Sequence, residues 1–233
     1  MIFATVCHGE LFTKRYSYEI NKVAKTNTVY VLTDKPEAFS NCIIRDYDTF
    51  IGTSQFTYYS KLLFLFALLE ELKERVNYVD ADFLKTTFNK GLVTDNTTLF
   101  TSVAVDYNKT LLGQLDYKKE KYSEWYKFLK EVNLETEGDK VFTYVTEAFW
   151  SFPYLDNISI IASRARELKK RIEEIFTLNP DHWKGTPLRR YAETGIGFGE
   201  GTAMSALVKE FNIPLQAVKH NKDLFNRKKF LIL

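Results

Sequence analysis

The stretch Arg75-Val76-Asn77-Tyr78-Val79-Asp80-Ala81-Asp82-Phe83 decides how the rest of the chain is interpreted, because an apolar β-type run ends there in two carboxylates. Alternate residues of a strand point to the same face, so Asp80 and Asp82 start out parallel, and a slight bend lets both reach one cation. Mg²⁺ and Mn²⁺ prefer oxygen ligands, and Mg²⁺ commonly binds through one or two carboxylates and the phosphates of a substrate. The pair therefore predicts a metal-diphosphate site at the C-terminal edge of a sheet. A surface turn, where Asp is common, is the alternative interpretation.

Length and composition are those of an α/β protein with a large core. The 233 residues are 45% hydrophobic and 15% aromatic, and α/β chains of this length often form one domain. The net charge is +2 with both signs mixed along the chain, which argues against a general nucleic-acid-binding coat but allows a local basic patch. We therefore expect a single domain over residues 1–233.

Cysteine content and hydropathy predict a cytoplasmic protein without a membrane segment. Cys7 and Cys42 are the only cysteines, too few for a disulfide framework or a structural zinc site. The chain opens in the strand-like run Ile2–Val6, without a charged leader and an apolar signal core. Leu62–Leu69 is the longest apolar run, and it is far short of the roughly 20 residues needed to span a bilayer.

A strand-helix-strand pattern begins the chain. We predict a buried strand at Ile2–Cys7, a helix from about Phe12 to Lys25, and a second strand at Thr28–Thr33 that is closed by a proline. Such a unit favours a parallel, right-handed crossover and places the loops after both strands on the same edge of the sheet. We expect a nucleotide to bind at those loops.

An apolar helix is predicted before the acidic stretch. Cys42–Arg45 is expected to be a short third strand, and Phe56–Lys73 is apolar on all sides, which indicates a helix buried under the sheet. Lys61 interrupts the apolar face of this helix near its start. Its side chain either packs its stem and reaches water with its ammonium group, or contacts a phosphate or ribose of the ligand.

The elements after the acidic pair are less regular, and no repeat or linker divides the chain. The pattern predicts a loop at Phe83–Phe100, strands at Thr101–Val105 and Val141–Trp150, and helices at Leu115–Val132 and Ile160–Phe176. The aromatic residues Phe149, Trp150 and Tyr154 either line an acceptor pocket or belong to the core.

A glycine-rich stretch near the C-terminus carries one acid. Gly195–Thr202 contains Glu200 among glycines and leads into a helix whose packed face includes Ala203 and Leu207. A carboxylate at a helix N-terminus stays ionised and suits accepting hydrogen bonds from sugar or acceptor hydroxyls. A plain helix cap is the alternative. A dinucleotide-binding loop is rejected, because that motif should follow the first strand.

The segment Ile213–Lys222 predicts a strand followed by an imidazole. His220, with Lys222 beside it, supplies a third metal ligand and a cation for a diphosphate. The basic residues at Arg227–Lys229 are expected to be a solvated tail.

Together these features resemble the sugar-nucleotide-dependent glycosyltransferases of the GT-A fold, and the resemblance covers most of the chain. It rests on the β/α nucleotide-binding half, on Asp80 and Asp82 after a hydrophobic strand, on Glu200 before a late helix and on His220. It implies a Rossmann-like half with a mostly parallel central sheet flanked by helices. Residues 1–105 would bind the sugar nucleotide, and residues 106–233 would bind the acceptor and close the metal site.

The resemblance also implies roles for individual residues. Asp80, Asp82 and His220 would hold Mn²⁺ or Mg²⁺ on the diphosphate of a donor such as a UDP-sugar, and Glu200 and Asp82 would act in catalysis. The other residues implied in donor binding are Thr5, Cys7, Thr33, Lys61 and Lys222.

The acceptor is the least determined part of the prediction. The Lys-, Asn-, Tyr- and Phe-rich composition resembles that of bacteriophage enzymes that glycosylate hydroxymethylcytosine in DNA, so we expect duplex DNA or otherwise a glycan or protein as acceptor. For DNA, we expect cations to converge on the cleft from Lys85, Lys90, Lys118, Lys119, Arg189 and Arg190. Two other classes stay open. A nucleotidyltransferase would need a phosphate-cradling motif, but the loop after the first strand has only Gly9. A non-catalytic nucleotide-binding module would need no Glu200.

Overall fold

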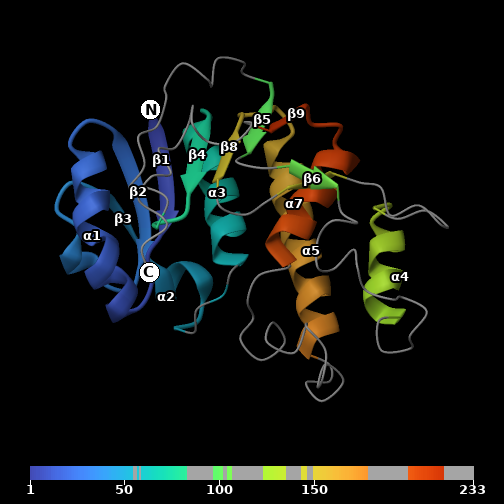
Figure 1. Ribbon diagram of the computed structural model, residues 1–233, viewed down its shortest axis with the longest axis horizontal. Helices are drawn as coiled ribbons and strands as arrows, with labels where there is room; N and C mark the ends of the chain where they lie inside the picture. The colour runs from blue at the N-terminus through green and yellow to red at the C-terminus, as the bar shows by residue number, and fades with distance from the viewer. Residues whose placement is uncertain are drawn as a thin grey trace.

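A seven-stranded mixed sheet forms the centre of the protein (Figure 1). The computed structural model describes residues 1–54, 57, 59–82, 97–101, 104–106, 123–134, 143–145, 149–177 and 199–217. The strand order is β3-β2-β1-β4-β8-β5-β9. These strands are β1 (Ile2–Val6), β2 (Thr28–Thr33), β3 (Ile43–Asp46), β4 (Val76–Val79), β5 (Leu99–Thr101), β8 (Phe149–Phe152) and β9 (Leu215–Ala217). A separate antiparallel pair joins β6 (Ala104–Asp106) to β7 (Thr143–Val145).

Within the seven-stranded sheet, six strands run in one direction and β8 runs against them. Strands β3, β2, β1 and β4 pair in parallel, β8 pairs antiparallel with both β4 and β5, and β5 pairs in parallel with β9. The chain moves outward from β1 to β2 and β3 and then returns to β4 on the other side of β1. A topological switch point therefore lies between β1 and β4, and the predicted α/β class with a mostly parallel sheet is confirmed.

Helices cover both faces of the sheet. The helices are α1 (Glu10–Ala24), α2 (Tyr47–Ile51), α3 (Tyr59–Leu72), α4 (Ser123–Glu131), α5 (Ile158–Thr177) and α7 (Gly199–Glu210), with a 3₁₀ turn at Pro36–Ala38. Helix α1 packs on one face against Phe3, Val31 and Phe149. Helices α3, α5 and α7 pack together on the other face, against Ala4 and Trp150. Figure 1 places α1 at one end of the molecule and α4 at the opposite end.

The alternation of the strands explains the two layers of the core. In β8, Trp150 and Phe152 point to the face covered by α3, whereas Phe149 points to the face covered by α1. Both faces are buried, which explains why the strand sequences are nearly continuous apolar runs. Phe149 and Trp150 are fully buried, so the core interpretation of these aromatic residues is confirmed.

The first half of the chain follows its sequence pattern closely. The predicted strand at Thr28–Thr33 is β2, and the predicted helix at Phe56–Lys73 is α3, which lies between the sheet and two other helices. Helix α1 buries Thr13, Tyr16 and Ile20 on one side. It begins two residues earlier than predicted, after Gly9 with a φ of 86°, a conformation that glycine adopts without strain.

The second half departs from the pattern in several places. The predicted strand at Val141–Trp150 is wrong as a single element, because β7 and β8 belong to different sheets. The predicted loop at Phe83–Phe100 includes the start of β5, and only residues 123–131 of the predicted helix at Leu115–Val132 are described as helix. No helix in the described part of the chain has the length and apolar character to cross a membrane.

Candidate functional site

Three charged side chains from distant parts of the sequence meet at the C-terminal edge of the sheet. The Nζ atom of Lys61 lies 2.9 Å from Oδ1 of Asp80 and 3.1 Å from Oε1 of Glu200. It also donates a hydrogen bond to Oδ2 of Asp80 at 3.2 Å. We refer to Lys61, Asp80 and Glu200 as the charged cluster.

Each member of the charged cluster stands at the end of a secondary-structure element. Asp80 directly follows β4, Lys61 lies in the first turn of α3, and Glu200 is the second residue of α7. The two helices thus begin at the edge where β4 ends. Glu200 lies inside the first turn of α7, whereas the sequence placed it in the glycine-rich loop before the helix, and it contacts Lys61 instead of forming a plain cap.

The cluster is largely shielded from water. Lys61 is 7% exposed and Glu200 is 1% exposed, while Asp80 is partly exposed. Of the two interpretations of Lys61, the one in which its ammonium group reaches water is therefore wrong, and contact with a phosphate or ribose stays a prediction. An ammonium group this deep needs paired carboxylates, because an isolated buried charge is strongly unfavourable.

The two carboxylates keep Lys61 protonated. Burial by itself lowers the pKa of the Lys61 ammonium group, but the negative charges of Asp80 and then Glu200 outweigh it and raise that pKa well above the ordinary range. Two carboxylates share one cation, so the charged cluster carries a net negative charge.

Two tyrosines from the core border the cluster. The Tyr78 hydroxyl donates a hydrogen bond to Oδ1 of Asp80 at 3.1 Å. Burial, followed by the charge of Asp80, raises the pKa of Tyr78 well above its usual value, so the hydroxyl stays a donor. Tyr59 is also buried, and burial followed by the charges of Glu200 and Glu173 raises its pKa in the same direction.

Asp82, the second acid of the predicted pair, lies beside the cluster and is partly exposed. Burial raises the pKa of the Asp82 carboxyl, and the negative charge of Asp80 raises it further, while Lys61 and Arg15 partly oppose this. The two carboxylates therefore repel each other at neutral pH. A bound divalent cation would relieve that repulsion.

Asp80 and Asp82 can supply oxygen ligands for such a cation. A carboxylate offers about four lone-pair positions, and Lys61 and Tyr78 make three contacts with Asp80. Within the described ranges no group of three or more His, Cys, Asp or Glu side chains is placed to hold a metal ion. If Mg²⁺ or Mn²⁺ bound to these two acids, phosphate oxygens and water would have to complete its coordination.

The neighbouring loops after β1 and β2 are tied together. The Gly9 amide donates a hydrogen bond to Oδ1 of Asp34 at 2.8 Å, which links the start of α1 to the end of β2. Thr5 and Thr33 are fully buried, and Oγ1 of Thr33 accepts a hydrogen bond from the Lys35 amide at 3.0 Å. The two loops lie on the same edge of the sheet, as the strand-helix-strand pattern predicted.

Cys7 lies directly after β1 with its thiol in the core. The thiol donates to Oγ1 of Thr13 at 3.8 Å. Burial raises the pKa of Cys7 to about 11, the Thr13 hydrogen bond lowers it in part, and the charge of Asp34 raises it further. The thiol is therefore neutral near pH 7, and its implied role in donor binding stays a prediction.

The other predicted site residues lie outside the described residues. These are His220, Lys222 and the basic residues Lys85, Lys90, Lys118, Lys119, Arg189 and Arg190. Strand β9 ends at Ala217, on the same edge of the sheet as Asp80, because β9 runs parallel to β5 and β5 runs in the direction of β4.

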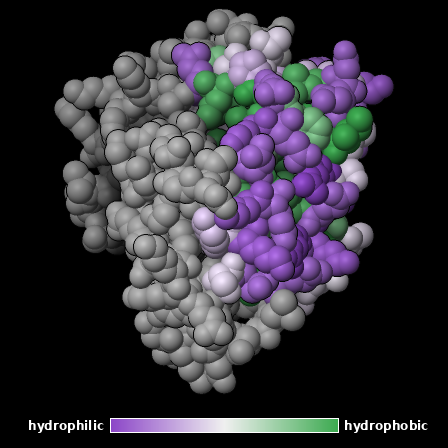
Figure 2. All heavy atoms as spheres, turned by 90° about the vertical axis from the view of Figure 1, so that its right-hand side faces the viewer, coloured by the Kyte–Doolittle hydropathy of each residue, from purple (hydrophilic) through white to green (hydrophobic). Residues whose placement is uncertain are grey.

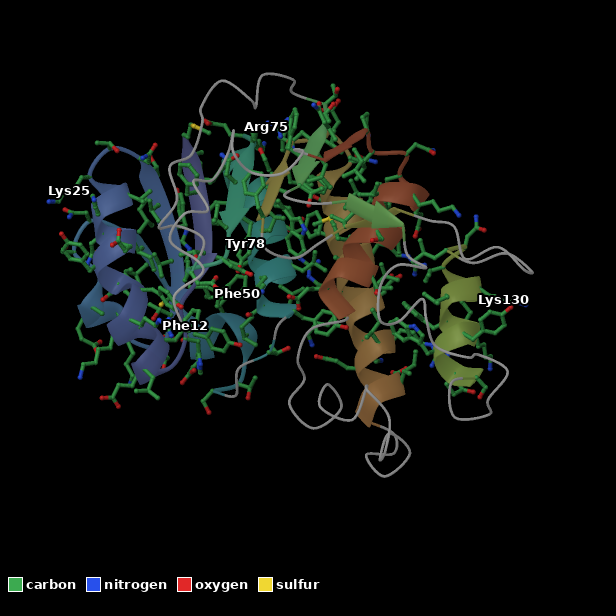
Figure 3. The ribbon with its side chains drawn as sticks, in the orientation of Figure 1. Phe12, Lys25, Phe50, Arg75, Tyr78 and Lys130 are labelled. Carbon is green, nitrogen blue, oxygen red and sulfur yellow. The ribbon has the colours of Figure 1, made fainter. Side chains whose placement is uncertain are left out.

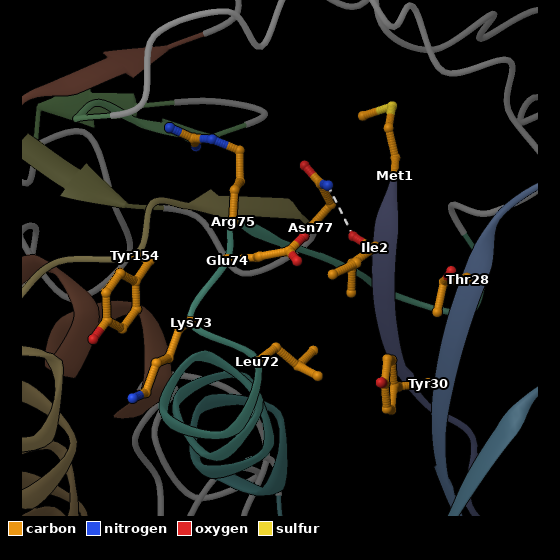
Figure 4. A pocket seen from close by; sticks show the side chains of 10 residues that line it. All are labelled: Met1, Ile2, Thr28, Tyr30, Leu72, Lys73, Glu74, Arg75, Asn77 and Tyr154. Carbon is orange, nitrogen blue, oxygen red and sulfur yellow. Dashed lines mark hydrogen bonds between the residues drawn. The ribbon is translucent and has the colours of Figure 1, made fainter.

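A pocket of about 860 Å³ opens at the opposite edge of the sheet, where β1, β2 and β4 begin (Figure 4). Tyr154, from the predicted aromatic cluster, lines this pocket together with Arg75 and Asn77. Arg75 donates hydrogen bonds to the Ser151 carbonyl and hydroxyl oxygens and to the Thr98 carbonyl oxygen. Its guanidinium group thus links the start of β4 to β8 and to the start of β5. The pocket is remote from Asp80 and Asp82.

Sequence reasoning missed three features of the C-terminal edge of the sheet, where Asp80 and Asp82 lie. The pairing of Lys61 with both carboxylates joins residues far apart in the chain, and no local pattern signals it. The contact of Tyr78 with Asp80 follows from strand alternation, since residues two apart share a face. The position of Asp34 after β2 could have been predicted from the sequence, because an acid at the end of a second parallel strand lies on the ligand-binding edge.

Comparison of the chain with protein-family models and with curated protein sequences finds no match in either.

Proposed function

We propose that this protein is a glycosyltransferase of the GT-A type, which moves a sugar from a nucleoside diphosphate donor to an acceptor hydroxyl. The observation that carries the proposal is the position of the acidic pair. Asp80 and Asp82 follow β4, next to the switch point between β1 and β4. In open α/β sheets, ligands bind outside the carboxyl ends of the strands at such a point.

The donor would lie along the edge formed by the ends of β2, β1 and β4. The loops after β1 and β2, linked by the hydrogen bond from the Gly9 amide to Asp34, would receive the nucleoside. Thr5, Cys7 and Thr33 are buried at the strand ends beneath these loops and would support them. The diphosphate would then lie toward Asp80. This placement follows the strand order β2-β1-β4, from the nucleotide-binding loops to the acidic pair.

Asp80, Asp82 and His220 would hold Mn²⁺ or Mg²⁺ on the diphosphate. The bound metal would supply positive charge to the phosphate oxygens as the leaving group departs. Lys222 would add a second cation there. Lys61 is already paired with Asp80 and Glu200, which supports a role in fixing the orientation of Asp80 rather than a first contact with phosphate.

Glu200 was expected to act in catalysis by accepting hydrogen bonds from sugar or acceptor hydroxyls, and its position favours a different role. Its side chain is 1% exposed and contacts Lys61, which favours positioning of Lys61 and Asp80 over direct contact with substrate. The acceptor proposed is hydroxymethylcytosine in DNA, with a glycan as the alternative.

The proposal is tested with the purified protein and a panel of nucleotide sugars. Release of nucleoside diphosphate is measured without acceptor, with Mn²⁺, with Mg²⁺ and with a chelator. We expect hydrolysis of one donor, dependent on the metal, and a fall of about a hundredfold in Asp82→Asn, equivalent to the few kcal/mol that metal stabilisation supplies. Asp156→Asn, which changes an exposed acid in the same way, should retain the activity.

Calorimetric titration with the nucleoside diphosphate gives the matching binding experiment. Affinity should require the metal and should be lost in Asp82→Asn but kept in Asp156→Asn. Equal affinity with and without metal would contradict the metal-diphosphate site. Transfer of a nucleotidyl group instead of a sugar to any acceptor would contradict glycosyl transfer.

A further inference from the structure

Helix α1 carries an exposed row of cations on the side away from the sheet. Its exposed residues include Lys14, Arg15, Lys22 and, at the C-terminal cap, Lys25. At about 100° per residue, these four fall within a sector of roughly 100° around the helix, together with Leu11 and Tyr18. We refer to Leu11, Lys14, Arg15, Tyr18, Lys22 and Lys25 as the basic stripe.

The basic stripe contains no acid. Glu10 and Glu19, the acids of α1, fall outside that sector on either side. Among the described residues, none forms a salt bridge with the four cations of the stripe. The positive charges therefore add along the helix.

The opposite side of the molecule shows that exposed cations need not form such a row. Where its residues are described, that surface is also mainly hydrophilic (Figure 2). On α5, however, Arg164 pairs with Glu167 and Glu210, and Lys169 pairs with Glu173. Arg164 and Lys169 are thus neutralised within the protein, whereas the cations of the basic stripe have no salt-bridge partner among the described residues.

Large side chains lie exposed within the stripe. Leu11 is 85% exposed and Tyr18 is 72% exposed. At its N-terminal end, Phe12 is 39% exposed with its ring 4.5 Å from that of Tyr16. Figure 3 places Phe12 and Lys25 toward opposite ends of α1, with Lys25 at the outer limit of the molecule. An exposed aromatic ring among cations is the combination that holds the bases and phosphates of a polynucleotide.

We propose that the basic stripe of α1 binds the sugar-phosphate backbone of a polynucleotide. From Lys14 to Lys25 the stripe spans about 16 Å along the helix axis, enough to face several successive phosphates. Tyr18 is placed to stack on an unpaired base.

An anionic membrane surface is the competing partner for a basic helix. Helices that lie in a membrane interface bury an apolar face in the lipid. The apolar face of α1, with Tyr16, Ile20 and Ala24, is instead buried against the sheet. Four cations beside one leucine and one tyrosine fit a soluble polyanion better than the acyl boundary of a bilayer.

The stripe leads to the acidic edge of the sheet. Helix α1 begins at Glu10, directly after Gly9, whose amide is bound to Asp34, and Arg15 is close enough to Asp82 to interact with its charge. A polynucleotide on α1 would therefore approach the metal-diphosphate site. This placement rests on the proposed function and names a polynucleotide as its acceptor, whereas the binding itself does not depend on glycosyl transfer.

The test measures binding without donor or metal. The probes are fluorescein-labelled DNA of about 20 base pairs and the corresponding single strand, titrated by anisotropy between about 50 and 200 mM salt. The variant Lys14→Gln/Lys22→Gln/Lys25→Gln should bind at least about tenfold more weakly, and its log-log salt slope should be smaller by about one for each lysine removed. Arg15 is left unchanged because of its proximity to Asp82.

A matched control removes the same charge elsewhere. Lys127→Gln/Lys170→Gln/Lys209→Gln changes three exposed lysines on α4, α5 and α7 and should keep the affinity and slope of the unmodified protein. Tyr18→Ala should weaken binding of the single strand about fivefold or more and bind the duplex nearly as before. Melting temperatures verify that each variant is folded.

Lysine acetylation of the unmodified protein provides a measurement that needs no variant. Bound polynucleotide should protect Lys14, Lys22 and Lys25 and leave Lys127 and Lys170 reactive.

Absence of salt-sensitive binding, equal losses in both lysine variants, or equal protection of all lysines would overturn the proposal. So would stripe-dependent binding to phosphatidylserine vesicles without polynucleotide binding, which would assign the stripe to membranes. Because the donor-hydrolysis experiment contains no polynucleotide, failure of this inference is distinguishable from failure of the proposed enzyme activity.

Discussion

At the scale of single residues, Lys61 determines the chemistry available to the acidic pair. Its ammonium group occupies positions on Asp80 that would otherwise face water or a ligand, and it binds Glu200 from a separate helix. One carboxylate of the pair is thus held rigidly. The other, Asp82, is free to respond to a ligand, since it lies beside the cluster and is partly exposed.

Replacing Lys61 should strongly destabilise the protein. Lys61→Met removes the cation that pairs with Asp80 and Glu200 in a shielded site. Breaking a buried ion pair from one side typically lowers the free energy of unfolding by about 3–5 kcal/mol. Chemical denaturation of the variant and of the unmodified protein measures this change.

The exposed ion pair between Arg45 and Glu71 provides the control. These side chains lie 2.6 Å apart with exposed fractions of 37% and 49%. Glu71→Gln should change the free energy of unfolding by no more than about 1 kcal/mol, because water screens the pair. Equal effects of the two substitutions would show that burial of the charged cluster contributes nothing to stability.

The raised pKa of Asp82 predicts that the free energy of unfolding depends on pH. Burial and the charge of Asp80 raise its pKa in the folded protein above the unfolded value, near 3.8. Ionised Asp82 therefore opposes folding once the pH exceeds the unfolded pKa, and the full opposition is reached above the folded pKa. Asp82→Asn should be more stable than the unmodified protein at pH 7, and this gain should disappear as the pH falls toward 3.8.

Thermal unfolding across this pH range, with Asp156→Asn as the exposed control, tests the effect. Mn²⁺ should raise the melting temperature of the unmodified protein at pH 7 but not that of Asp82→Asn, because a bound metal stabilises the folded state. A gain in stability that is the same at all pH values would contradict electrostatic coupling between the two acids.

At the scale of secondary structure, the sequence predicted the elements whose periodicity is strong. The apolar runs of β1 and β2, the all-round hydrophobicity of α3 and the 3.6-residue period of α5 each indicated the observed element. These patterns are local consequences of burial, so they are readable without knowledge of the partner element.

The predictions that failed concern elements whose formation depends on long-range packing. The stretch from Val141 to Trp150 alternates throughout, yet the structure divides it between two sheets, because β8 inserts between β4 and β5 while β7 pairs with β6. Helix α7 includes Gly199 and Gly201, which local propensity disfavours in a helix. Ser205 accepts a hydrogen bond from the Val145 amide and donates one to the Gly201 carbonyl oxygen, which secures the helix against β7.

The candidate site could be predicted only in part for the same reason. Asp80 and Asp82 are recognisable because their chemistry is local to one strand end. The convergence of Glu200 on Lys61 depends on how α7 packs beside α3, which no sequence pattern records. The contact therefore appears only when the helices are placed on the sheet.

At the scale of the whole molecule, strand order brings distant segments to one edge. The strands β1, β2, β4 and β9 all end there, so the loops that follow them come from the beginning, the middle and the late part of the chain. The basic stripe of α1 begins at the same edge. A polynucleotide and a sugar nucleotide could thus meet where the acidic pair lies, although the overall net charge is only +2.

The same topology defines the prediction for His220. It follows the end of β9 by three residues, and β9 is separated from β4 by β8 and β5. Three strand spacings amount to about 14 Å, whereas three extended residues span at most about 10 Å, so the imidazole and carboxylate side chains would have to span the remaining distance of about 4 Å. We expect His220→Ala to weaken the apparent affinity for Mn²⁺ in donor hydrolysis by at least about tenfold and to leave the melting temperature without metal unchanged. Asn221→Ala, next to it in the chain, is the control and should retain the Mn²⁺ affinity. A loss of stability in His220→Ala with no change in metal affinity would instead assign this histidine to the packing of the chain after β9.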